Sequence, residues 1–237
     1  ILAAQNATVA QFESGAGVIS SLGTSVSPFY PVHDTELMPQ DPLQAIKSGN
    51  AAGVDVLIGS NSDETTLWSY GDVDDAKLQR IATDFDVANG LSTYQTSRPN
   101  ANAEQLLVAL TSDHMFRIPC IRLAEAQLNH TPNVWMYLFD WKSRAFEGRL
   151  GATHALEIPF AFNNLDRAGV DVFIGPGPMP QQLADTMHNA WSGFMKNGSP
   201  DWPSYTIGER STMVFAETSN TVNDPMGDER SVWEGIR

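Results

Sequence analysis

Two short apolar runs stand out along this chain. Residues 54–59, Val-Asp-Val-Leu-Ile-Gly, and residues 134–141, Val-Trp-Met-Tyr-Leu-Phe-Asp-Trp, are rich in β-branched and aromatic side chains. Runs of this length and composition are typical of strands that are covered on both faces, as in mostly parallel sheets. Residues 212–215 predict a further short strand before a polar tail. The pattern indicates an α/β fold.

Helical spacing of apolar residues surrounds these runs. Asp41 and Pro42 offer an N-cap and a first-turn proline for a short helix that ends at Gly49. Residues 74–127 are largely helical in pattern, and residues 181–196 carry an apolar stripe that Asn197-Gly198 closes as a C-cap. The strongest segments of the first region are 76–81, 103–110 and 117–127. We therefore expect a mostly parallel sheet flanked by helices.

Composition narrows the choice of partners. The 237 residues carry a formal net charge of −14, with 14 Lys and Arg residues that are scattered along the chain. Such a polyanion is repelled by nucleic acid and by anionic membranes, so neither is an expected partner. The chain also lacks a run of about 18 apolar residues of the kind that spans a bilayer.

A single cysteine, Cys120, excludes an intrachain disulfide. This favours a cytoplasmic origin and leaves secretion open, because the true N-terminus can lie upstream of Ile1. Cys120 stands in an apolar stretch with no histidine beside it, so we interpret it as a small core residue.

Two ionisable residues follow the two strongest strands. Glu64 lies in the polar turn 60–65 after the first strand, and the loop 142–153 after the second leads to His154. The carboxyl ends of parallel strands are where open α/β sheets build their sites. Each residue alone also fits an ordinary role, as a solvated acid or a structural histidine.

The sequence segments around Glu64 and His154 resemble segments of one protein family. Residues 151–162, Gly-Ala-Thr-His-Ala-Leu-Glu-Ile-Pro-Phe-Ala-Phe, are similar to the catalytic-histidine signature of type-B carboxylesterases and cholinesterases. Residues 57–64, which end in Asp-Glu, look like the family segment that ends in its triad glutamate. The resemblance implies an α/β-hydrolase fold in which Glu64 is the acid and His154 the base of a catalytic triad, with no cofactor or metal.

Weaker likenesses run from about residue 28 to the C-terminus. They include residues 30–42, although Thr35 stands where the family usually has glycine, residues 113–124 and residues 190–203. The resemblance implies that residues 1–237 are the C-terminal portion of a single carboxylesterase catalytic domain. Residues 74–130 would be a helical insertion between the acid and histidine loops.

The family's nucleophile has no counterpart in this sequence. Its Gly-x-Ser-x-Gly elbow is absent, and Ser14 lacks a glycine two positions before it and two positions after it. Because α/β-hydrolases run serine, acid, histidine along the chain, the serine would lie before Ile1. We expect an ester hydrolase whose N-terminal portion is missing, removed or a separate polypeptide, and a fragment that is inactive alone. The alternative is a catalytically inactive cholinesterase-like domain that binds a protein; a glycosidase has no specific support.

Several other residues have plainer interpretations. No two histidines have metal-ligand spacing. Glu157 is too close to His154 to orient it, so we expect a structural hydrogen bond or salt bridge. Asp113 is interpreted as a helix-cap or solvated residue, with a buried polar network behind the site as the alternative. The tryptophans near the loops are predicted to pack in the core, with an acyl pocket as the alternative: Trp68, Trp135 and Trp141.

Overall fold

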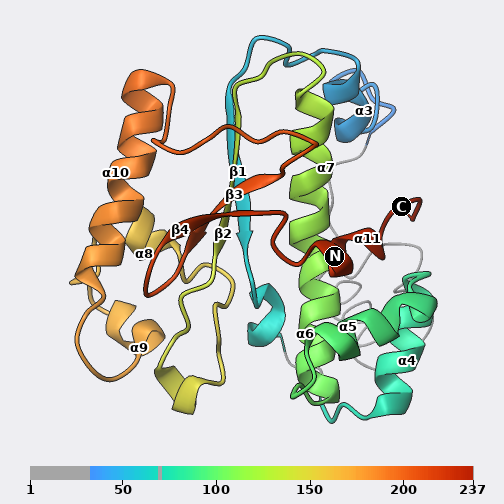
Figure 1. Ribbon diagram of the computed structural model, residues 1–237, viewed down its shortest axis with the longest axis vertical. Coiled ribbons are helices and arrows are strands. Elements are labelled where there is room, and N and C mark those ends of the chain that lie inside the picture. The colour runs from blue at the N-terminus through green and yellow to red at the C-terminus, as the bar shows by residue number, and fades with distance from the viewer. Residues whose placement is uncertain (1–32, 69–70, 237) are drawn as a thin grey trace.

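The computed structural model describes residues 33–68 and 71–236, which form a sheet with helices on both faces (Figure 1). The strands lie in the order β1-β2-β3-β4. They are β1 Val56–Asn61, β2 Val134–Phe139, β3 Ser211–Phe215 and β4 Asn220–Asn223. The β1–β2 and β2–β3 pairs are parallel and the β3–β4 pair is antiparallel. The predicted mostly parallel sheet is confirmed, with β1 displaced two residues toward Glu64 from the predicted 54–59.

Helices connect β1 to β2 and β2 to β3, and others precede β1 and follow β4. The α-helices are α3 Pro42–Lys47, α4 Asp75–Asp84, α5 Leu91–Ser97, α6 Ala103–Ser112, α7 Ile118–Gln127, α8 Ile158–Ala161, α9 Val170–Ile174, α10 Gln181–Asn197 and α11 Gly227–Ser231. The 3₁₀ turns are η1 Glu64–Leu67, η2 Ala88–Gly90 and η4 Ala145–Gly148, and η3 Asp113–Arg117 is a π-helical turn between α6 and α7. The predicted polar tail instead contains β4 and α11.

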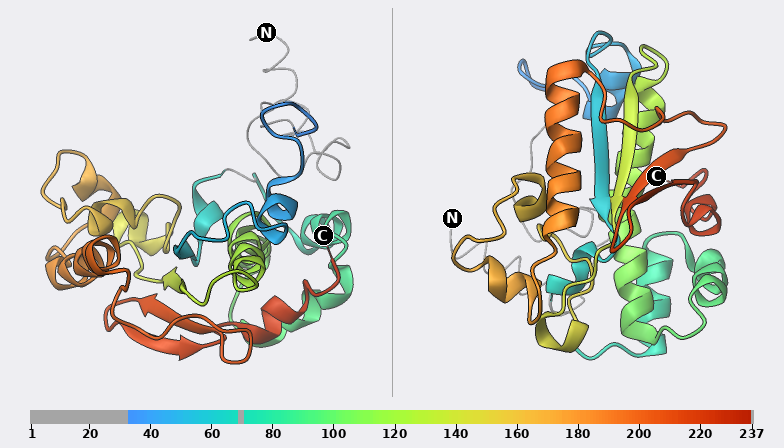
Figure 2. Two further views of the ribbon diagram at one scale, coloured as in Figure 1. Left: turned by 90° about the horizontal axis from the view of Figure 1, so that it is seen from above. Right: turned by 60° about the vertical axis from the view of Figure 1, so that its left-hand side comes forward.

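Alternation along β2 explains why both sheet faces are covered. Trp135 and Phe139 belong to the core under α10, whereas Val134 and Met136 belong to the core under α7. Successive side chains of a strand point to opposite faces, so a continuous apolar run supplies both cores at once. Figure 2 shows the two helices on opposite sides of the sheet.

The ends of two helices follow the predicted capping chemistry. The Asp41 carboxylate accepts hydrogen bonds from the backbone N–H groups of Leu43 and Gln44 at the start of α3. At the end of α10, Gly198 has φ +71° and donates its N–H to Phe194 O at 2.9 Å. A left-handed residue at this position favours glycine, which explains the Asn-Gly ending.

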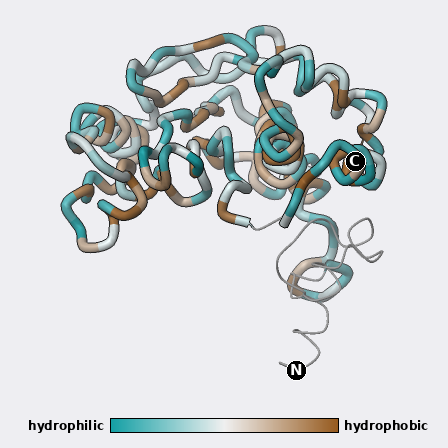
Figure 3. The backbone as a smooth tube through the Cα atoms, turned by 90° about the horizontal axis from the view of Figure 1, so that it is seen from below, coloured by the Kyte–Doolittle hydropathy of each residue, from teal (hydrophilic) through white to brown (hydrophobic). Residues whose placement is uncertain are grey.

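The helical region between β1 and β2 has its own apolar core. Residues from α4, α5, α6 and α7 form it, and Trp233, which follows α11, is buried among them. The C-terminal segment thus leaves the sheet and packs against the helices (Figure 1). Apolar and polar stretches alternate along the chain (Figure 3). None of the described helices is long and apolar enough to cross a membrane.

Candidate functional site

The acid loop is built directly from the end of β1. Glu64 is the first residue of η1, three positions after the last residue of the strand, and its side chain is buried. Its Oε1 accepts the backbone N–H of Asn61 at 2.8 Å, which leaves Oε2 free to face another group. The tight turn therefore fixes the direction of the carboxylate.

His154 meets this carboxylate although it lies 90 positions away. His154 Nδ1 is 2.7 Å from Glu64 Oε2, and the backbone N–H of His154 donates to Glu64 O at 3.1 Å. The side chain of His154 is 47% exposed, whereas that of Glu64 is 6% exposed. Within the described residues, the only hydrogen bond of the ring is the one at Nδ1, and nearly half of the side chain is exposed. The structure thus brings together the two residues that the sequence singled out.

Asn61 ties the histidine loop to the end of β1. Its Nδ2 donates to Thr153 O at 2.7 Å and to Glu157 Oε2 at 2.6 Å. The prediction that Glu157 has a structural hydrogen-bonding role is confirmed. Nothing in the sequence pattern pointed to Asn61, because a polar residue at a strand end has no distinguishing period.

Two aromatic rings lie against the imidazole. The ring centroids of Trp68 and Phe116 are 5.5 Å and 5.2 Å from that of His154, at tilted angles. Trp68 also borders an open recess of about 850 Å³, which reaches from Arg98 to Gly151. Of the tryptophans predicted to pack in the core, Trp135 and Trp141 do so, and Trp68 lies at the site.

Burial dominates the electrostatics of the acid. Loss of hydration raises the pKa of Glu64 above its ordinary value of 4.5, although the Asn61 N–H and the His154 ring act in the opposite direction. Glu157 adds a small further increase in the pKa. The hydrogen bond from the imidazole stabilises the charged carboxylate and so offsets part of its lost hydration.

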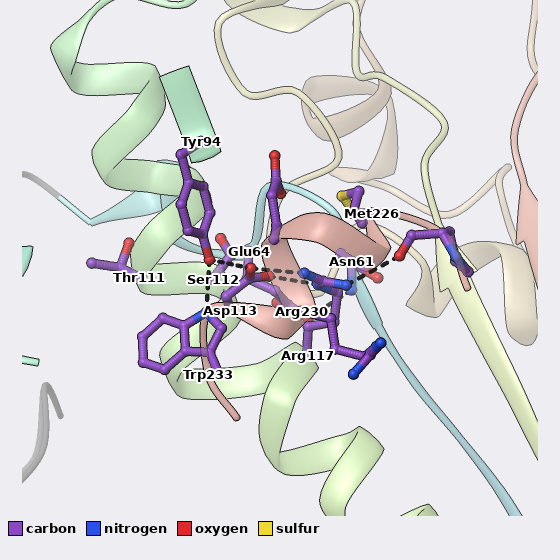
Figure 4. A network of polar contacts seen from close by, with 12 residues as sticks. Asn61, Glu64, Tyr94, Thr111, Ser112, Asp113, Arg117, Met226, Arg230 and Trp233 are labelled. Carbon is purple, nitrogen blue, oxygen red and sulfur yellow. Dashed lines mark hydrogen bonds and ion pairs between the residues drawn. The ribbon is translucent and has the colours of Figure 1, made fainter. Parts of the chain in front are cut away.

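Asp113 lies in a buried polar network near the acid loop (Figure 4). Its carboxylate accepts bonds from Arg117 Nε at 2.6 Å and from the Tyr94 hydroxyl at 2.5 Å, and that hydroxyl accepts from Trp233 Nε1 at 2.7 Å. The interpretation of Asp113 as a helix-cap or solvated residue is wrong, and the alternative holds. Burial explains the difference, since a buried carboxylate requires a cation and further donors.

The π-helical turn connects this network to the acid loop. Thr65 Oγ1 is 2.7 Å from Thr111 Oγ1, and the backbone N–H of Thr65 donates to Ser112 Oγ at 3.3 Å. Phe116, within the turn, contacts the imidazole. The end of α6 and the turn after it therefore support both sides of the Glu64–His154 pair.

Among the described residues, no group of three or more His, Cys, Asp or Glu side chains could hold a metal ion. Cys120 is half-buried and its thiol donates to Gly59 O at 3.3 Å. It lies beside the core rather than within it, so the predicted core position is only approached.

Comparisons with known proteins bear on the family and the fold of the chain. The sequence profile of the carboxylesterase family matches residues 4–230. Para-nitrobenzyl esterase of Bacillus subtilis is 31% identical over 209 residues, and phenmedipham hydrolase of Pseudarthrobacter oxydans is 28% identical over 207 residues. These matches cover 85% and 80% of this chain but 42% and 40% of the relatives, so the chain spans less than half their length.

A solved structure shows the same architecture. The carboxylesterase EST55 of Geobacillus stearothermophilus superposes with a TM-score of 0.75 at 31% identity, covering 90% of this chain and 47% of that protein. The family match begins well before residue 28, where the likenesses read from the sequence begin. The chain has the α/β-hydrolase fold and belongs to the carboxylesterase family.

Proposed function

We propose that this chain carries the acid and the base of a serine carboxylesterase, whose nucleophile lies on an N-terminal portion outside this sequence. The observation that carries the proposal is the 2.7 Å contact between His154 Nδ1 and Glu64 Oε2 beyond the carboxyl ends of β1 and β2. A histidine held by a buried carboxylate through one ring nitrogen, with the other accessible, is the arrangement that acyl transfer requires.

His154 acts as the general base and then as the general acid. Its Nε2 takes the proton of the serine hydroxyl while the serine oxygen attacks the ester carbonyl, and the imidazolium then protonates the departing alkoxide. Water repeats the cycle on the acyl-enzyme and releases the acid. Glu64 keeps the proton on Nδ1 and stabilises the imidazolium, so that Nε2 is the nitrogen that faces the reaction.

The serine and the oxyanion-stabilising N–H groups belong to the N-terminal portion. The chain order serine, acid, histidine places that segment upstream of Glu64. Within the described residues β1 pairs on one side only, with β2, so its other edge is available to a further strand. We propose that the N-terminal portion covers this edge and that the present chain alone is inactive.

The substrate class is a small carboxylic ester. The name of one relative, a para-nitrobenzyl esterase, supports hydrolysis of esters that contain an aromatic ring. Trp68 and Phe116 beside His154 provide apolar rings on which such a group can pack.

The test is hydrolysis of p-nitrophenyl acetate by this chain alone and by the chain joined to its upstream coding region. We expect activity only in the longer protein, a serine adduct with an organophosphate upstream of Ile1, and loss of activity in His154→Ala. His33→Ala is the matched control, because the His33 side chain is 53% exposed and pairs only with its neighbour Asp34 among the described residues. A longer protein that lacks both esterase activity and the serine adduct would favour the inactive binding domain instead.

A further inference from the structure

The orientation of His154 needs more support than burial provides. Nearly half of its side chain is exposed, so surrounding atoms alone do not fix the ring. The backbone N–H of His154 donates to Glu64 O at 3.1 Å. The position of the imidazole therefore depends on the groups that hold the backbone at and before His154.

Asp63, the residue before the acid, pairs with the histidine loop in two directions. Its Oδ2 accepts the backbone N–H of Ala152 at 2.8 Å, and its own backbone N–H donates to Ala152 O at 3.1 Å. His154 N–H then bonds to Glu64 O, so residues 63 and 64 hold residues 152 and 154 in register. These backbone hydrogen bonds form a short ladder between the two loops, and the ladder ends at His154.

Gly151 fits closely against this carboxylate. It has φ +58°, a left-handed conformation that favours glycine, and a Cβ placed there would lie 2.3 Å from Asp63 Oδ2. The loop can thus approach Asp63 only because residue 151 has no side chain. The left-handed conformation and the close approach to Asp63 therefore both favour glycine at position 151.

Lys142 holds the Asp63 carboxylate from the other side. Its Nζ is 2.6 Å from Asp63 Oδ2, 2.7 Å from Asp140 Oδ1 and 2.8 Å from Ser62 Oγ. Desolvation works against the ammonium charge, but the two carboxylates outweigh it and raise the pKa of Lys142 above its ordinary value. Asp63 therefore accepts from a charged donor just beyond β2 and from the histidine loop through the same oxygen.

We propose that Asp63 is a positioning residue for His154: its carboxylate, held by Lys142, fixes the backbone at Ala152 and thereby keeps Nδ1 of His154 on Glu64. The inference rests on the proposed function for its catalytic consequence, but its geometric part does not. A misplacement of a catalytic group by about 1 Å can lower turnover on the order of 100-fold.

The geometric part is tested by NMR of the ¹⁵N-labelled histidine rings, with the His154 signals identified by their loss in His154→Ala. In the unaltered protein we expect neutral His154 to be the tautomer protonated at Nδ1, as the bond to Glu64 requires. Asp63→Ala should lose this signature. Asp63→Asn should keep most of it, because the amide oxygen can still accept from Ala152 N–H and Lys142.

Asp140→Ala is the matched control. It removes the other carboxylate bound to Lys142 but no hydrogen bond to residues 151–154, so the Nδ1-protonated signature should remain. Asp140→Ala losing the signature as fully as Asp63→Ala would overturn the specific role of Asp63. Gly151→Ala is a second variant that displaces the loop while Asp63 is present, and it should lose the signature.

In the longer, active protein Asp63→Ala should lower kcat about 10- to 100-fold with KM changed by less than about threefold, and Asp63→Asn should recover most of the loss. If unaltered protein lacks the Nδ1 signature, the Glu64–His154 pairing and with it the proposed function fail. If it has the signature and Asp63→Ala retains it, only the role of Asp63 fails. Should Asp63→Ala not fold, retention of the signature by Gly151→Ala would overturn the proposal.

Discussion

The backbone N–H of Asn61 donates to Oε1 of Glu64 at 2.8 Å, so the last residue of β1 holds one oxygen of the carboxylate whose other oxygen meets His154. Each oxygen of Glu64 thus has a separate fixed donor. Rotation of the carboxylate would break both bonds at once, in a site where water cannot readily replace them because Glu64 is buried. The strand itself supplies the rigidity of the acid.

Glu64→Gln tests this arrangement in the longer, active protein. The amide can accept from Asn61 N–H with its oxygen, but it then turns its NH₂ group toward His154 Nδ1 and favours the tautomer with the proton on Nε2. We expect kcat to fall by a factor of thousands, which corresponds to about 4 to 5 kcal/mol of barrier. The measurement is steady-state hydrolysis of p-nitrophenyl acetate, with the exposed Glu209→Gln as control. A loss below tenfold contradicts the role of Glu64 as the triad acid.

Burial of Glu64 also predicts how stability depends on pH. Its folded pKa is raised above 4.5, chiefly by desolvation, so the protonated form is the one that the fold favours. The stabilising contribution of Glu64 is therefore fully present below pH 4.5 and is lost as the pH rises through the folded pKa. In Glu64→Gln this loss is absent, so its stability should fall less than that of the unaltered protein as the pH rises above 4.5.

Thermal unfolding followed by circular dichroism between about pH 4 and pH 7 checks this difference. Glu209→Gln should follow the unaltered protein throughout, since Glu209 is exposed. If the stability of Glu64→Gln and of the unaltered protein changed equally with pH, ionisation of Glu64 would not destabilise the fold.

Helical spacing of apolar residues predicted five of the nine described α-helices, and apolar runs predicted the three parallel strands. The C-terminal end of β1 was missed because Ser60 and Asn61 are polar yet buried in the strand, at 5% and 2% exposure. Periodicity treats a polar residue as exposed, whereas Asn61 is buried because it bonds to Thr153 and Glu157 across the sheet edge. Hydrogen-bond partners far along the chain leave no local pattern.

The same limit explains what was missed elsewhere. β4, Asn-Thr-Val-Asn, pairs with β3 at the exposed edge of the sheet and so needs no apolar face. The role of Asp113 depends on Tyr94 and Arg117, of which only the i+4 partner could have been read from the sequence. The meeting of Glu64 and His154 was expected from the family resemblance and from their places after two strands; spacing alone could not show it.

Cys120 provides a test of the interior on that side of β1. Burial, with a further contribution from the charge of Glu64, raises the pKa of the Cys120 thiol to about 12. Because only the thiolate reacts, the native protein at pH 8 should react with a disulfide reagent roughly 1,000-fold more slowly than an unperturbed thiol. Ellman's reagent in the absence and presence of denaturant gives the two rates. Comparable rates would show that Cys120 is accessible.

The Tyr94 hydroxyl connects the helical region to the C-terminal segment, and its removal should be costly. In Tyr94→Phe the buried Trp233 indole N–H loses its acceptor and Asp113 loses one of its donors. Leaving the indole N–H unpaired costs about 1 to 3 kcal/mol, and the lost bond to Asp113, which Arg117 still pairs, costs about 1 kcal/mol. We therefore expect the free energy of unfolding to fall by about 2 to 4 kcal/mol. Urea unfolding with an unchanged slope measures this loss.

Tyr137→Phe is the matched control for this substitution, because among the described residues the Tyr137 hydroxyl makes no hydrogen bond although its ring packs against Trp191. Removing that hydroxyl takes away no hydrogen bond and should change the free energy of unfolding by less than about 1 kcal/mol. Equal losses of unfolding free energy in Tyr94→Phe and Tyr137→Phe would contradict a specific role for the hydrogen bonds of the Tyr94 hydroxyl. The difference between them therefore isolates the Trp233–Tyr94–Asp113 connection, through which the C-terminal segment is held against the helix that supports Thr65 and the acid loop.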